Sequence, residues 1–100
     1  MRDAAQMQGE EMLTRETIIE QTRDFIVKNF LYMRPDVLVE PASALLERGI
    51  IDSLGVVELL TFVEETFAVA AADEEITEEN FGSLDSIAQF VQRKRAVETA

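Results

Sequence analysis

The stretch that decides the fold is Gly49-Ile50-Ile51-Asp52-Ser53-Leu54, and a strongly apolar segment follows it as far as Phe67. Prolines at positions 35 and 41 stand upstream, so residues 31–52 are predicted to form a long loop and not a continuous helix. Asp52 is a favourable N-cap, because its carboxylate can accept a hydrogen bond from a backbone N–H of the first turn. The pattern therefore predicts a helix over about residues 53–67, with Ser53 in its first turn.

The start of that helix is a favourable place for negative charge, because its first backbone N–H groups have no acceptor within the helix. A phosphate linked to Ser53 would lie beside them. The chain contains no histidine and no cysteine, so it lacks the commonest general base and any thiol nucleophile of its own. We therefore expect Ser53 to be an attachment point for a group that another enzyme adds, and the chain itself to be non-catalytic.

The predicted helix over residues 53–67 is apolar on two faces. The second of these faces comprises Leu54, Val57 and Thr61, with Glu58 beside them. A small bundle cannot easily bury every face of a helix, so this second face is predicted to be an exposed docking surface. The alternative is a helix buried on all sides. The first face, which we assign to the core, consists of Val56, Leu59, Leu60, Val63 and Phe67.

Helices are also predicted on both sides of this segment. Thr14 is a candidate N-cap for a first helix over about residues 15–30, whose apolar residues recur at helical spacing. An alternating pattern after Phe67 suggests a short extended connector. Thr77 is then a candidate cap for a one-turn helix ending at Phe81, and Ser83 for a final helix.

These elements predict an all-α fold, a bundle of three longer helices and one short helix with a long loop after the first helix. The domain is predicted to cover residues 14–95. Residues 1–13 are expected to be a flexible N-terminal extension and residues 96–100 a frayed tail.

The charge distribution excludes some partners and favours others. The net charge is −11, and residues 36–85 contain thirteen acids and one base. Such a surface would repel nucleic acid and anionic membranes and attract basic proteins. No apolar run is long enough to span a bilayer, and the start of the sequence lacks the apolar core of a signal peptide. We therefore expect a cytoplasmic monomer without a membrane span.

Several of these motifs resemble those of the acyl carrier protein family. They are Asp52-Ser53-Leu54 with the helix after it, Asp73-Glu74-Glu75-Ile76, and Asn80-Phe81-Gly82-Ser83-Leu84. The resemblance covers about residues 14–92 and implies an acyl-carrier-like four-helix bundle. It also implies that Ser53, within a motif shared with Asp52 and Leu54, carries 4′-phosphopantetheine attached by a phosphopantetheinyl transferase. The arm would hold acyl groups as thioesters and present them to biosynthetic enzymes of lipid or secondary metabolism.

The resemblance further implies that Leu54, Val57, Glu58 and Thr61 meet partner enzymes with basic docking patches. It suggests an interior that opens for an apolar cargo, with candidate linings at Phe30, Leu59, Val63, Ala71 and Phe81. Bulk fatty-acid carriers commonly have an acidic residue where this chain has Gly55, and a larger aliphatic residue where it has Ala71. These departures favour a specialised stand-alone carrier.

Three other interpretations remain open. The chain could be an aminoacyl or peptidyl carrier of the same fold. It could be an unmodified acidic helical module that docks a basic partner through the helix over residues 53–67. Finally, Asp73-Glu74-Glu75 and Glu78-Glu79 could hold a hard cation weakly, although their spacing does not match a calcium-binding EF-hand loop, and no metal site is expected.

Overall fold

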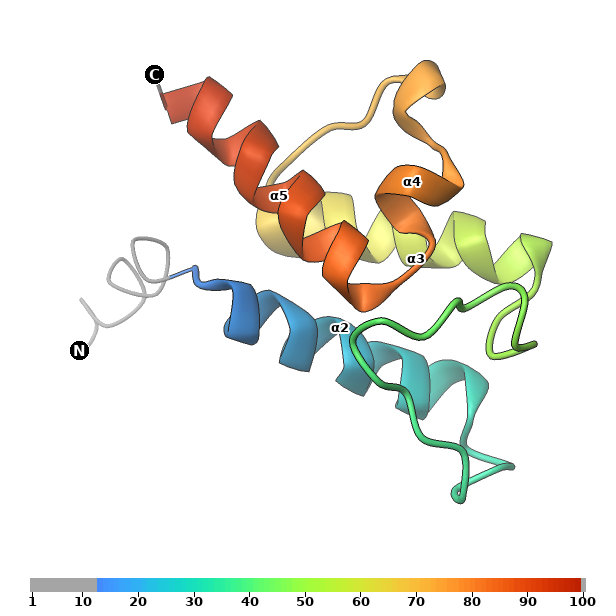
Figure 1. Ribbon diagram of the computed structural model, residues 1–100. Helices are drawn as coiled ribbons and strands as arrows, with labels where there is room; N and C mark the ends of the chain where they lie inside the picture. The colour runs from blue at the N-terminus through green and yellow to red at the C-terminus, as the bar shows by residue number, and fades with distance from the viewer. Residues whose placement is uncertain (1–12, 100) are drawn as a thin grey trace.

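Three long helices and one short helix make up the computed structural model, which describes residues 13–99 (Figure 1). Residues 1–12 of the predicted N-terminal extension, and Ala100, lie outside the described residues. Within that range no strand occurs, so the all-helical prediction is confirmed for this part of the chain. The elements are α2 (Arg15–Phe30), α3 (Ser53–Phe67), the 3₁₀ helix η1 (Asp73–Glu75), α4 (Glu78–Phe81) and α5 (Leu84–Thr99).

Each of the four α-helices within residues 13–99 begins directly after a residue whose side chain caps it. Thr14, Asp52, Thr77 and Ser83 each accept a hydrogen bond from the backbone N–H of the third residue after them. Such a bond satisfies one of the N–H groups that a helix start leaves without an acceptor. All four predicted caps are therefore confirmed. At its other end α5 continues to Thr99, into the segment for which the sequence predicts fraying.

The core lies where α2 packs against both α5 and α3 (Figure 1). Burial of each of its large apolar side chains stabilises the fold by about 1.5–3 kcal/mol. In the part of the chain that the structure describes, no helix combines the length and the apolar character needed to cross a membrane. The core residues with no exposed surface include Ile18, Ile26, Leu45, Leu59, Val63, Leu84, Ile87, Phe90 and Val91.

The long loop between α2 and α3 is fastened to the rest of the fold at its middle. Leu45 is fully buried, and its backbone N–H donates to the carbonyl of Gly82 at 2.9 Å. The carbonyl of Leu45 accepts from the backbone N–H of Ile50, also at 2.9 Å. A second link to the start of α5 runs from the N–H of Asp85 to the carbonyl of Pro41. The loop therefore reaches α3 along a defined path, although it contains no helix or strand.

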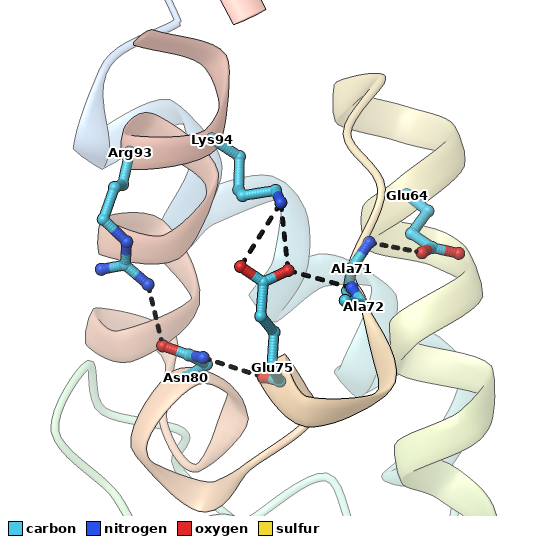
Figure 2. A network of polar contacts seen from close by, with 7 residues as sticks. All are labelled: Glu64, Ala71, Ala72, Glu75, Asn80, Arg93 and Lys94. Carbon is cyan, nitrogen blue, oxygen red and sulfur yellow. Dashed lines mark hydrogen bonds and ion pairs between the residues drawn. The ribbon is translucent and has the colours of Figure 1, made fainter. Parts of the chain in front are cut away.

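The connector from α3 to α4 is held by side-chain hydrogen bonds (Figure 2). The carboxylate of Glu64 accepts from the N–H of Ala71 at 2.9 Å, which ties the connector back to α3. The carboxylate of Glu75 accepts from the N–H of Ala72 at 2.9 Å and from the ammonium of Lys94 at 3.0 Å. The connector is thus linked to α3 at one end and to α5 at the other. It is not a strand, and the η1 turn within it was not predicted.

Asn80 extends this network to α4. Its side-chain amide donates to the carbonyl of Glu75 at 2.8 Å, and its side-chain oxygen accepts from Arg93 at 3.0 Å (Figure 2). Both cations that reach the network, from Lys94 and Arg93, come from α5. The short helix α4 is therefore held against α5 by polar contacts as well as by its buried Phe81.

We expect Glu75→Gln to lower the melting temperature at pH 7. The hydrogen bond from Ala72 and the contact with Lys94 hold the pKa of the Glu75 carboxyl below its ordinary value of 4.5. Because the folded pKa is depressed, the stabilisation is fully present above pH 4.5 and is lost as the pH falls through the lower folded pKa. Thermal unfolding followed by circular dichroism should show a difference at pH 7 that shrinks below pH 4.5.

Glu74→Gln is the matched control, because Glu74 is exposed and forms no hydrogen bond or ion pair within residues 13–99. Equal melting temperatures for the two variants at pH 7 would contradict the assignment.

Candidate functional site

The site is built on the capped start of α3. Asp52 has an extended backbone, with φ −109° and ψ −175°, and its Oδ1 accepts from the N–H of Gly55 at 2.8 Å. Its carbonyl accepts from the N–H of Val56 at 3.0 Å. The first helical residue is Ser53, as predicted. The cap therefore orients the first turn of α3, in which Ser53 and Leu54 are exposed to solvent.

Ser53 is exposed, and its hydroxyl forms no hydrogen bond within residues 13–99. The backbone N–H groups of Ser53 and Leu54 also have no acceptor in this part of the chain, because the cap satisfies only the two N–H groups that follow them. Their dipoles and that of the helix favour an anion beside the Ser53 hydroxyl. The arrangement presents a free hydroxyl next to two available donors.

Gly55 is needed for close packing at this helix start. A Cβ atom at this position would lie 3.2 Å from the Cβ of Ile51, 3.2 Å from the ring of Phe30 and 3.3 Å from Oδ1 of Asp52. All three distances are tighter than ordinary van der Waals contact. From the sequence, Gly55 stands out only as a residue at a position where bulk fatty-acid carriers commonly have an acidic residue. The structure adds a packing reason, which is the approach of the α3 start to the end of α2.

The two apolar faces of α3 have different surroundings. Leu59, Val63 and Phe67 of the first face are buried in the core. On the second face, Leu54 is 76% exposed and Val57 is 60% exposed. The alternative of a helix buried on all sides is therefore wrong. Glu58 and Thr61 are exposed beside them, so the four predicted docking residues lie together on one face of α3, starting next to the candidate attachment site.

A groove of about 370 Å³ extends this surface to α2. The rings of Phe25 and Phe62 stack along it, with centroids 4.3 Å apart and planes inclined by 18°. Glu58 and Glu65 border it, and no lysine or arginine does. Sequence reasoning missed the contribution of α2, because periodicity places Phe25 on the core face and cannot show that its ring stays half-exposed. The remaining lining residues are Asn29, Val57, Thr61 and Thr66.

The predicted cargo linings divide into two groups. Leu59 and Val63 are fully buried within the core, and Phe30 and Ala71 are partly buried against it. A separate apolar hollow of about 120 Å³ lies between α3, the long loop and α4, and among the predicted linings only Phe81 borders it. Val56 forms the α3 side of this hollow, one helical turn after Ser53.

The acidic residues near α4 do not form a metal site. Within residues 13–99, no group of three or more His, Cys, Asp or Glu side chains gathers in a way that could hold a metal ion. The carboxylate of Glu75 is engaged by Lys94 and the Ala72 N–H instead. The weak cation site considered for Asp73–Glu79 is therefore not supported.

No protein-family model matches this chain, and no curated protein matches it with significance. A function for the chain therefore rests on the geometry and chemistry of the α3 start and the surfaces beside it.

Two substitutions of Asp52 should show how much its capping oxygen stabilises the start of α3. We expect Asp52→Ala to lower the free energy of unfolding by about 1 kcal/mol, because the N–H of Gly55 loses its acceptor. Asp52→Asn keeps an oxygen in that position and should cost much less. Urea unfolding at 25 °C measures both values. A loss of the same size in the two variants would show that the carboxylate charge, and not the capping oxygen, is what stabilises the helix start.

Proposed function

We propose that the chain is an acyl carrier protein, in which Ser53 bears a 4′-phosphopantetheine arm. The arm would hold acyl groups as thioesters and present them to biosynthetic enzymes of lipid or secondary metabolism. The observation that carries the proposal is the exposed Ser53 hydroxyl at the capped start of α3, beside two backbone N–H groups without acceptors. The resemblance of the surrounding motifs to acyl carrier proteins supports the same conclusion.

The attachment chemistry suits a side chain that is accessible but not activated. A phosphopantetheinyl transferase would deprotonate the Ser53 hydroxyl, whose oxygen would attack the pantetheine-linked phosphorus of coenzyme A. A new Oγ–P bond forms, the pyrophosphate P–O bond breaks, and adenosine 3′,5′-bisphosphate leaves. The phosphodiester keeps one negative charge, which the N–H groups of Ser53 and Leu54 and the helix dipole would stabilise. With no cysteine in the chain, the thiol of the arm would supply the sulfur for the thioester.

The surface around Ser53 suits recognition by basic enzymes. Leu54 and Val57 offer exposed apolar contacts, and Glu58 adds a carboxylate beside them. Residues 36–85 contain thirteen acids and one base, so their field would steer a basic partner toward this face. Once docked, a tethered thioester reaches the active site at a high effective concentration. The hollow beside Val56 and Phe81 is a candidate place where an apolar cargo would enter the bundle.

A second candidate function is an unmodified docking module for a basic partner. The observation that favours it is the α2–α3 groove, which has an aromatic floor between Glu58 and Glu65 and needs no group on Ser53. The two functions differ in one respect that can be measured, namely whether Ser53 accepts phosphopantetheine.

Incubation with a broad-specificity phosphopantetheinyl transferase, coenzyme A and magnesium should add one phosphopantetheine to the wild-type chain. Intact-mass spectrometry measures the gain, and Ser53→Ala should show none while keeping its helical circular dichroism spectrum. If the purified chain already carries the arm, the starting mass will show it. No gain on the folded, unmodified protein, with a known carrier modified in parallel, would overturn the carrier function in favour of the docking module.

Charge reversal on α3 should impair the transferase reaction. We expect Glu58→Lys to lower kcat/KM for phosphopantetheine transfer about tenfold, a change of about 1.4 kcal/mol, because a basic partner loses an attractive contact and gains a repulsive one. Glu20→Lys is the matched control, since Glu20 is an exposed acid on α2 that does not border the docking surface. The difference between the variants should shrink as ionic strength rises. Equal losses in both would assign the effect to net charge alone.

A further inference from the structure

A second groove, of about 420 Å³, lies on a different side of α2, where the long loop folds back along the helix. Val27 and Leu31 form its helical wall, and Val37 and Leu38 of the loop face them. Leu38 is 71% exposed and Val27 is 38% exposed, so this part of the apolar lining is open to solvent, whereas Leu31 is buried beneath it. The volume falls within the range of ligand sites, about 300–1,000 Å³.

Two arginines border this groove without a carboxylate partner. The Nε of Arg23 donates to the carbonyl of Val39 at 2.8 Å, and an Nη of Arg34 donates to the carbonyl of Gly49 at 2.8 Å. These bonds to neutral carbonyls hold the guanidinium groups in place and leave further N–H donors on each. Neither arginine forms an ion pair within residues 13–99, whereas three other cations there do.

The groove also lies in the part of the chain that is electrically neutral. Residues 23–48 contain four acids and four bases, so the whole excess of −11 resides elsewhere. Screening limits the effect of distant charges to about 8–10 Å at physiological ionic strength. At the border of this groove an anion would meet two arginines and one carboxylate. Glu40 is the one acidic residue that borders the groove, and it forms no ion pair within residues 13–99.

We propose that this groove binds an aliphatic carboxylate. The carboxylate accepts hydrogen bonds from the guanidinium of Arg34 at the exposed end, and the hydrocarbon chain lies along Val27 and Leu38 toward Arg23. Arg23 and Leu31 are about 12 Å apart along the helix, which gives the apolar floor room for a chain of medium length. An arginine binds a carboxylate in a bidentate manner, and the apolar walls bury the chain. The site involves neither Ser53 nor the docking face of α3.

The first test is a titration of the ¹⁵N-labelled, unmodified chain with octanoate, followed by amide chemical shifts. Saturable shifts should concentrate at Val27, Arg34 and Leu38. Acetate, which has the charge without the chain, and octylammonium, which has the chain with the opposite charge, should bind at least tenfold more weakly. Equal binding of octylammonium at these amides would overturn the proposal, as would octanoate shifts confined to the hollow beside Phe81. Failure of Ser53 modification would leave this experiment unaffected, so the two proposals fail separately.

Matched variants test separately where the carboxylate and the hydrocarbon chain of the ligand bind. Leu38→Ser and Arg34→Gln should each raise the Kd for octanoate at least fivefold, and Gln keeps a donor for the Gly49 carbonyl. Met33→Ser and Arg48→Gln are the controls, because Met33 is 77% exposed and neither residue borders the groove. Glu40→Gln should lower the Kd, since it removes the one negative charge at the site. Equal weakening by the controls, or weaker binding in Glu40→Gln, would contradict the assignment.

Discussion

Burial of Leu45 is the contact on which the position of the α3 start depends. The loop between the long helices has no regular structure of its own, and ordering each of its residues costs about 1–2 kcal/mol of backbone entropy. Leu45 offsets part of this cost, because its side chain is fully buried and its N–H and carbonyl bind Gly82 and Ile50. One residue thus joins the α4–α5 corner to the segment that leads into Asp52. The cap itself is local, because Asp52 accepts from the backbone N–H of a residue only three positions later.

The elements with strong local signals could be predicted from the sequence. The bounds of α2 and α3 follow from Thr14 and Asp52, two side chains that cap locally, and from apolar residues at helical spacing. Their local nature is the reason for this success. The η1 turn depends only partly on a local contact, since the Glu75 carboxylate that accepts from the N–H of Ala72 is also held by Lys94, nineteen residues further along the sequence. The last residues of α5 also lack an apolar stripe, so no pattern in the sequence marks its end at Thr99.

Some features of the candidate site could likewise be predicted from the sequence, and others could not. Ser53 and the exposed face of α3 follow from one segment, so periodicity and charge were sufficient to predict their exposure. The α2–α3 groove depends on the stacking of Phe25 on Phe62, two residues from different helices. The pattern of apolar residues within one helix cannot predict which residue of another helix lies against it. The packing role of Gly55 could not be predicted for the same reason, because it depends on a residue of another helix. Its lack of a side chain accommodates Phe30, which the long loop separates from it in the sequence.

The two grooves have opposite electrostatic character because of where the bases lie. On α3 the carboxylates of Glu58 and Glu65 border an aromatic floor without a nearby cation, so a cationic partner gains both attraction and apolar contact. On the other side of α2, Arg23 and Arg34 are held by carbonyls and not by carboxylates, so their charge is not neutralised locally. Net charge alone would make the whole surface repel anions. The fold departs from this expectation at one place, because the loop aligns its carbonyls with two arginines and brings one carboxylate, that of Glu40, to the same groove.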